Sequence, residues 1–263
     1  MKLLTLNTHS IIDSAYEKKI ATFANAIIKH TPDVIALQEV MQSQNGGVAE
    51  KSELLTAPNI HVKEDNFAHR VLKKLNEHSL YYHGVYLGIK NAYGKYDEGL
   101  AILTSKEITS TEVTQLTKFN DYNNYKTRFA LGARIDGAWY YSLHFNWWED
   151  TDSPFRYEWD ALLEALHSKK GVWLMGDFNI TPSSQGYELV TKKYHDTYML
   201  AKEVDNGITV HGGIDGWEND ASKKRIDYIF TDKSVEIKSS STVFNGKDGE
   251  IISDHFGVLV EKE

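Results

Sequence analysis

Residues that can bind a cation or move a proton recur beside short apolar segments, and this pattern constrains the fold more than any other feature of the chain. The apolar run 172–176 ends in the turn Gly176-Asp177-Phe178-Asn179, and Ser253-Asp254-His255 stands directly before the apolar run 256–261. In layered folds, strands deliver side chains of this kind to loops along one edge. The pattern therefore predicts a strand-rich, layered chain whose functional groups gather at one edge.

Hydrophobic periodicity predicts a few helices among many strands. Apolar residues recur at helical spacing within 15–30, 65–78 and 154–168. Short apolar runs predict strands at 2–6, 34–37, 81–89, 99–104, 107–117, 128–135, 138–145, 172–176, 226–231, 234–244 and 256–261. The polar stretch 41–64 contains Gly46-Gly47 and Pro58 and is predicted to be a long loop. Such an arrangement indicates two sheets packed face to face with helices outside.

Composition narrows the class of protein. The 263 residues are long enough for a sizeable core, and we expect one domain spanning 1–263. There is no cysteine, which excludes disulfides and thiolate metal sites. The formal net charge of -8 opposes binding of a long polyanion, so a small charged substrate is favoured over nucleic acid. The sequence shows no signal peptide and no run that could span a bilayer, so a cytoplasmic protein is expected, with no membrane partner and no obligate protein partner.

Six predicted strands carry polar residues that are candidates for chemistry. Five of these groups lie at strand ends or just beyond, and Asp227 lies inside the apolar run Arg225 to Phe230. Each carboxylate taken alone could instead cap a turn or pair with an arginine, and each histidine could be a surface residue. The whole set is harder to explain structurally, and its members are Asn7, Glu39, His144, Asp177 with Asn179, Asp227, and Asp254-His255.

This set, in this order, resembles the endonuclease/exonuclease/phosphatase superfamily. The resemblance covers essentially the whole chain through Leu6-Asn7, Leu37-Gln38-Glu39, Gly99-Leu100-Ala101-Ile102-Leu103, His144, Gly176-Asp177-Phe178-Asn179, Arg225-Ile226-Asp227-Tyr228 and Ser253-Asp254-His255. It implies a DNase I-like four-layer α/β sandwich, in which two packed mixed β-sheets are flanked by helices. It also implies metal-assisted hydrolysis of a phosphate ester.

The resemblance assigns roles that the chemistry of the residues supports. Glu39 is expected to be the principal ligand of Mg²⁺, or of Mn²⁺, because a hard anionic oxygen suits a hard cation. Asn7 and Asp254 are expected to complete the metal site. The resemblance also implies five catalytic groups. Asp177 would orient or deprotonate the attacking water, Asn179 would bind phosphoryl oxygens, and His255 would stabilise developing charge. Asp227 would fix the His255 tautomer, and His144 would be a second histidine.

The substrate is indicated by residues in predicted loops and by Arg128 at the start of the predicted strand 128–135. Arg128 is a candidate phosphate clamp, and Glu98 is a candidate partner for hydroxyl groups. Aromatic faces at Trp147, Trp148 and Trp217 could stack on a sugar ring, although each of them could equally cover core. The segments around His144, Glu98 and Trp217 are similar to a bacterial branch that contains maltose 6'-phosphate phosphatases. That likeness implies a small phosphorylated substrate, such as an imported disaccharide phosphate.

Three alternatives use the same fold. A sphingomyelinase would share the catalytic set, but the secreted bacterial forms carry apolar membrane-contact loops that are not apparent here. A DNA endonuclease or exonuclease would need basic loops, and Lys223-Lys224-Arg225 is the best local run. A non-catalytic binding module is disfavoured because Glu39, Asp177, Asn179 and His255 are all present.

Overall fold

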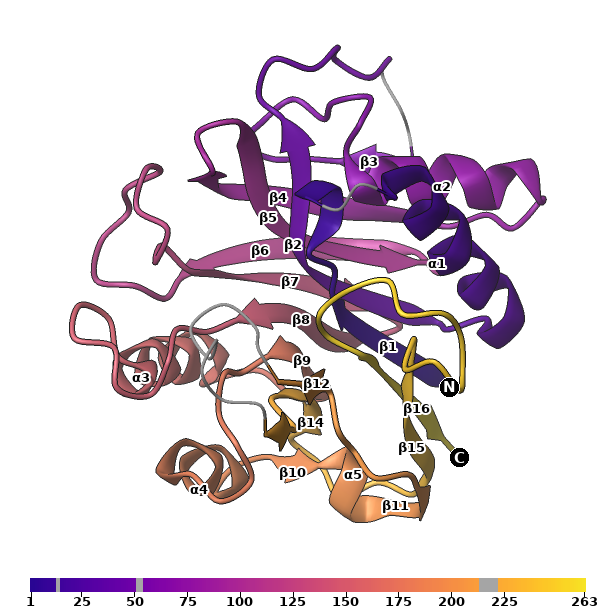
Figure 1. Cartoon of the computed structure of the whole chain (residues 1–263). Coiled ribbons are helices and arrows are strands. Elements are labelled where there is room, and N and C mark those ends of the chain that lie inside the picture. The colour runs from indigo at the N-terminus through magenta and orange to yellow at the C-terminus, as the bar shows by residue number, and fades with distance from the viewer. Residues whose placement is uncertain (13–14, 51–53, 213–221) are drawn as a thin grey trace.

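Two β-sheets packed face to face form the centre of the molecule, and helices cover their outer faces (Figure 1). This arrangement comes from a computed structural model, which describes residues 1–12, 15–50, 54–212 and 222–263. The prediction of a four-layer α/β sandwich with two mixed sheets is confirmed. No helix in these ranges is both long and apolar enough to cross a membrane.

The larger sheet has eight strands and the smaller has six. The eight strands follow the order β11 (Ala201–Val204), β15 (Ile237–Val243), β16 (Gly257–Lys262), β1 (Lys2–Asn7), β2 (Val34–Ser43), β5 (Tyr96–Thr104), β4 (His83–Ala92) and β3 (Leu55–Thr56). The six follow the order β10 (His195–Asp196), β14 (Asp227–Thr231), β9 (Val172–Asp177), β8 (Ala138–His144), β7 (Phe129–Ile135) and β6 (Ile108–Gln115). A separate ribbon pairs β12 (Val210–His211) with β13 (Lys223–Lys224).

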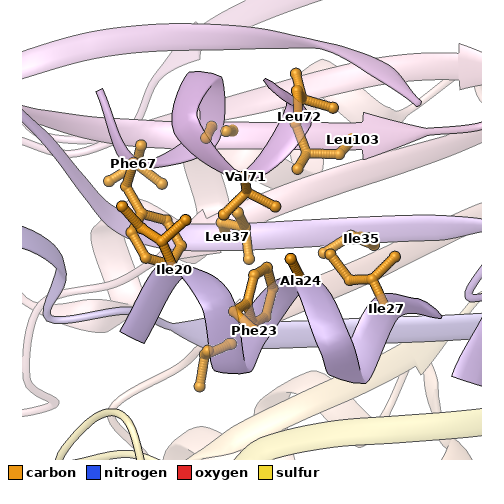
Figure 2. Close-up of a cluster of buried hydrophobic side chains, with 14 of the residues drawn as sticks. Ile20, Phe23, Ala24, Ile27, Ile35, Leu37, Phe67, Val71, Leu72 and Leu103 are labelled. Atoms are coloured by element: carbon orange, nitrogen blue, oxygen red, sulfur yellow. The ribbon is translucent and has the colours of Figure 1, made fainter. Parts of the chain in front are cut away.

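The three longer helices lie outside the sheets because each presents one apolar stripe. The remaining elements are η1 (Ser10–Ile12), α1 (Tyr16–His30), α2 (Phe67–Glu77), α3 (Phe155–Leu166), α4 (Gln185–Thr191) and α5 (Thr197–Leu200). Figure 2 shows Phe23 and Ile27 of α1 facing Leu37 and Ile35 of β2, within the cluster that joins α1 and α2 to the larger sheet. Helical spacing of apolar residues produces such a stripe, and its burial stabilises the layer.

Two further apolar clusters complete the layers. The cluster between the sheets includes Leu100, Leu131 and Met175, each at most 2% exposed. The third cluster packs Trp159 of α3 against Leu174 of the smaller sheet. The three clusters alternate with the sheets and explain why near-continuous apolar runs in the sequence became strands buried on both faces.

The predicted loop at 41–64 was partly wrong. Strand β2 continues to Ser43, β3 forms at Leu55–Thr56, and Val48 forms an isolated bridge with Lys63. The polar residue Gln42 is buried in β2, where its amide donates to Asp97 Oδ2 at 3.0 Å and to the His61 carbonyl at 2.9 Å. The polarity of this segment had predicted a loop. The structure differs because a polar side chain can lie inside a sheet when its hydrogen bonds are satisfied.

Two β-bulges lie on either side of Gly99 and direct side chains toward one edge. The register between β2 and β5 shifts between Leu37 and Val40, so Glu39 lies in a bulge with φ 50°. The register between β4 and β5 shifts between Gly88 and Lys90. The sequence had placed Glu39 at the end of a strand, and the structure corrects this, because a bulge re-aims a side chain without ending the strand.

Gly176 allows the turn through Asn179 to follow β9 without a clash. Its φ is 145°, and a Cβ at this position would lie 2.0 Å from the Leu143 carbonyl oxygen of β8. We expect Gly176→Ala to lower the free energy of unfolding by about 1–3 kcal/mol more than Gly137→Ala does. Gly137 is the matched control because it also has positive φ, 79°, but open space around a new Cβ. Urea denaturation measures both variants, and equal losses would contradict the steric account.

Candidate active site

Asn7 lies where the two sheets meet and connects their carboxylates. It ends β1, and its Nδ2 donates to Glu39 Oε1 at 3.0 Å and to Asp177 Oδ2 at 3.2 Å. Glu39 belongs to the larger sheet, and Asp177 ends β9 of the smaller one. A single buried amide therefore joins a carboxylate from each sheet.

Antiparallel pairing brings the remaining polar residues to the same edge. Asp227 begins β14 and stands opposite Asp177 in the register with β9. Asp254 and His255 come just before β16, which runs antiparallel to β1, so they lie beside the end of β1. The Ser253 hydroxyl donates to the Asn7 carbonyl at 2.7 Å and fixes this approach. Asp254-His255 thus reaches the edge from the start of a strand rather than from the end of one.

His255 lies between two carboxylates that favour its protonated form. Its Nδ1 is 2.9 Å from Asp227 Oδ2, and its Nε2 is 3.8 Å from Asp177 Oδ2. Burial alone would lower the pKa of His255, but Asp227 and Asp177 raise it well above the usual value. Burial and the charge of Asp227 raise the pKa of Asp177 to about 7. The buried group of His255 and two aspartates therefore retains a proton near neutral pH.

His144 has the opposite electrostatic surroundings. Its Nε2 lies 3.6 Å from Asp177 Oδ2. Burial, followed by the nearby charges of Arg128 and Lys90, lowers the pKa of His144 well below the usual value. The site thus shifts the pKa values of its two imidazoles in opposite directions, and groups whose pKa values are pushed apart are suited to opposite proton-transfer roles.

Asn179 is fixed by the turn that Gly176 begins. Its backbone N–H donates to Asp177 Oδ1 at 2.9 Å, and its Nδ2 donates to the Phe145 carbonyl at 2.8 Å. Its φ is 50°, in the left-handed region that asparagine tolerates better than most residues. Phe178, between the two polar residues, is fully buried against Phe145 and Phe230 and anchors the turn.

The negative charges near Glu39 favour a bound divalent cation. Burial raises the pKa of Glu39, and the negative charges of Glu98 and Asp254 raise it further. Carboxylates that repel one another in this way are stabilised by a bound cation, and hard oxygen donors fit Mg²⁺ or Mn²⁺. Asp177, Asp227 and His255 also place ligand atoms within 4.8 Å of one another. In that group, however, the imidazole already supplies positive charge to both carboxylates.

The site opens into a cavity of about 510 Å³. Its wall includes the predicted residues Glu39, Glu98, Arg128, His144, Trp147, Asp177, Asn179, Asp254 and His255. Trp148 does not line this cavity; it packs on Phe155 at 6.1 Å between ring centroids, on the outer apolar cluster. Trp217 lies outside the described residues.

Several residues of the cavity wall were missed by sequence reasoning. Lys90 is buried and pairs with Glu98 at 3.1 Å, and its Nζ donates to the Tyr125 carbonyl at 2.6 Å. The Tyr125 side chain is 69% exposed and lines the cavity. His9 lines it too, two residues after Asn7. His9 follows the end of β1 with positive φ, so strand alternation gives no signal for it, and Lys90 depends on a bulge that also leaves no clear signal in the sequence.

This edge, with its carboxylates, amides and imidazoles, defines a phosphoester hydrolase of the DNase I-like type. The sequence pattern of the Endonuclease/Exonuclease/phosphatase family matches residues 4–255, and the chain belongs to that family. Its members hydrolyse phosphoester bonds, so the chain is an enzyme of this class. No curated protein matches the chain.

Solved structures agree with this membership. A family protein from Leptotrichia buccalis C-1013-b is 32% identical, with a TM-score of 0.88 over 100% of this chain and 99% of that one. A mannosyl-6-phosphatase from Bacteroides thetaiotaomicron VPI-5482 is 18% identical, with a TM-score of 0.68 over 99% and 98% of the two chains. A 3' phosphatase from Neisseria, bound to a product DNA hairpin, is 18% identical, with a TM-score of 0.66 over 100% and 99%. At 18% identity these last two share the fold alone.

We expect Asp227→Asn to lower kcat by about 10²–10⁴-fold, because the amide no longer stabilises a protonated His255 in the orientation observed. Asp232→Asn is a suitable control, since Asp232 only accepts hydrogen bonds from backbone N–H groups of Gly171 and Val172, at the opposite end of β9. Steady-state phosphate release measures the effect, and circular dichroism checks the fold. A kcat within twofold of wild type for Asp227→Asn would refute this role.

Proposed function

We propose that the chain is a divalent-metal-dependent phosphomonoesterase that acts on a sugar phosphate, such as maltose 6'-phosphate. Mg²⁺ is the proposed metal, with Mn²⁺ as the alternative, and Glu39, Asp254 and Asn7 would hold it. We further propose that residues 1–263 form a single domain, because both sheets contribute to one centre. A cytoplasmic location stays a prediction.

The cavity carries this proposal. Its floor is the group of carboxylates and imidazoles, and its wall continues to Tyr93, Tyr125 and Trp147. Tyr93 and Tyr125 are 61% and 69% exposed. A volume of about 510 Å³ exceeds what a phosphate group needs and matches pockets that take small organic ligands. Exposed aromatic faces beside polar groups are suited to the mixed apolar and hydroxylated faces of a sugar.

The residues suggest how an ester would be hydrolysed. When bound, the metal would polarise the phosphoryl oxygen and offset its charge. Asp177 would orient the attacking water and accept its proton, since its pKa is raised to about 7. The cationic His255 would stabilise the charge that develops on the phosphoryl oxygens. Its ring is oriented by Asp227, whose Oδ2 lies 2.9 Å from Nδ1. Asn179 and Arg128 would bind the remaining phosphoryl oxygens.

Charge favours a small monoester over DNA. Two cations in the cavity wall are partnered by carboxylates, Lys90 by Glu98 and Lys126 by Asp150 at 2.8 Å, while Arg128 donates to the backbone carbonyls of Tyr125 and Thr127. The basic run 223–225 does not provide a nucleic-acid surface, because Arg225 is paired with Asp196 at 2.8 Å and Lys224 is buried. A DNA 3' phosphatase is the second candidate, since the Neisseria enzyme that shares this fold acts on a DNA end.

A substrate screen tests this proposal. Purified protein with Mg²⁺ is incubated with disaccharide and monosaccharide phosphates, inositol phosphates, sphingomyelin, 3'-phosphorylated DNA and plasmid. We expect fastest phosphate release from a sugar phosphate and no turnover by Glu39→Ala or His255→Ala, because these lose the metal ligand and the cation. Plasmid cleavage without phosphate release from any monoester would overturn the proposal, and so would near-normal rates in both variants.

Trp147→Ala tests the sugar-binding wall. We expect kcat/KM for the best sugar phosphate to fall about fivefold or more, because stacking on an aromatic face contributes roughly 1 kcal/mol or more. Hydrolysis of a small aryl phosphate should change less. Tyr81→Ala is the control, since Tyr81 is 68% exposed but does not line the cavity. Equal losses on both substrates would show that Trp147 supports the fold rather than the sugar.

A further inference from the structure

The side-chain amide of Asn146 lies in the cavity wall in one fixed orientation. Asn146 follows the end of β8 by two residues, lines the cavity and is only 3% exposed. Its Nδ2 donates to Glu158 Oε1 at 2.7 Å and to the Lys126 carbonyl at 2.7 Å. A carboxylate and a backbone carbonyl are acceptors, so only the nitrogen of the amide can face them. The amide oxygen, Oδ1, therefore lies on the side of the group that faces neither of them.

Glu158 prevents the amide from turning over. Its carboxylate projects from α3 and is fully buried, and its Oε2 accepts the backbone N–H of Asn146 at 2.9 Å. Both oxygens of Glu158 are thus occupied by one asparagine, through its backbone and its side chain. A rotated amide would bring Oδ1 against the carboxylate and leave a buried acceptor unsatisfied, which is costly. The orientation of Asn146 is therefore set before any ligand arrives.

The Oδ1 atom of Asn146 is open to the cavity. In the part of the chain that the structure describes, no group donates a hydrogen bond to it, and it is not one of the enclosed polar atoms that lack a partner. An amide oxygen accepts hydrogen bonds and cannot donate them. Since phosphoryl oxygens are also acceptors, this atom would repel the anionic end of a substrate. It is suited to a hydroxyl group, which can donate.

This open acceptor lies beside the aromatic part of the wall. Trp147 follows Asn146 directly, and Tyr125 precedes Lys126, whose carbonyl the amide binds. Both aromatic residues line the cavity. A sugar ring presents apolar C–H groups on its face and hydroxyl groups at its edge. An aromatic face with a fixed acceptor next to it can contact both at once.

We propose that Asn146 is a specificity-determining residue, whose Oδ1 accepts a hydrogen bond from one hydroxyl group of the substrate. The inference rests on the sugar phosphatase activity proposed above. It goes further by assigning the residue that recognises the hydroxylated part of the substrate and the direction of the hydrogen bond. The competing account is that Asn146 only fastens the Lys126 segment to α3.

Substrate analogues test the direction of this hydrogen bond in the wild-type protein. The probes are maltose 6'-phosphate and analogues in which one hydroxyl group at a time is replaced by hydrogen or by fluorine. We expect kcat/KM to fall about 5–100-fold for the deoxy analogue that lacks the bound hydroxyl, because a buried acceptor loses its donor. The matching fluoro analogue should lose as much, since fluorine cannot donate. Deoxy analogues that all stay within about twofold of the parent would overturn the inference, and so would a matching fluoro analogue that keeps the parent value.

Asn146→Ala connects the loss to this residue. In the variant, maltose 6'-phosphate and the sensitive deoxy analogue should have similar kcat/KM, because the hydroxyl no longer has its acceptor. Phenyl phosphate, whose ring carries no hydroxyl group, should change less. Asn245→Ala is the control and should keep the wild-type difference, since Asn245 also donates Nδ2 to a backbone carbonyl, that of Thr242 at 3.0 Å, but does not line the cavity. Circular dichroism checks the fold of both variants.

The outcomes separate this inference from the proposed function. An equal loss on all substrates in Asn146→Ala, with the deoxy difference unchanged, would assign Asn146 a structural role and overturn the inference alone. No phosphate release from maltose 6'-phosphate by the wild type would contradict the proposed substrate and overturn the inference with it.

Discussion

The amide of Asn7 is the interaction on which the rest of the centre depends. It is 1% exposed and donates both to Glu39 of the larger sheet and to Asp177 of the smaller one. Layers of apolar side chains hold the sheets together but do not specify how their edges align to a fraction of an ångström. A buried donor shared by two carboxylates does specify it, because leaving either partner unsatisfied is costly.

Strain and negative charge are concentrated at the same edge. His9, Glu39 and Asn179 all have positive φ, and each contributes a side chain or backbone group to the site. Residues in this conformation persist only where the surroundings over-determine them. Here Lys19, Thr8 and the Phe145 carbonyl do so. The repulsion that raises the pKa of Glu39 has the same origin, since the fold gathers carboxylates before any cation is present.

The sequence predicted the layers well because strands buried on both faces appear as continuous apolar runs, and helices with one apolar stripe appear as apolar residues at helical spacing. The polar residues beside those strands were also visible, and the structure brings Asn7, Glu39, Asp177 and His255 together. Bulges were not predictable, since the extra residue at Glu39 depends on pairing with β5, which local sequence does not encode. For the same reason Lys90 was missed, while Trp148 was expected near substrate and packs on Phe155. The local sequence does not show whether an aromatic residue in a loop packs into the core or lines a cavity.

The most direct test of the central claim is a crystal structure with Mn²⁺ and inorganic phosphate, in which anomalous scattering locates the metal. The account predicts a peak in contact with the carboxylates of Glu39 and Asp254, with phosphate between the metal and the side chains of Asn179 and His255. A peak between Asp177 and Asp227 instead, or no peak at this edge, would contradict it.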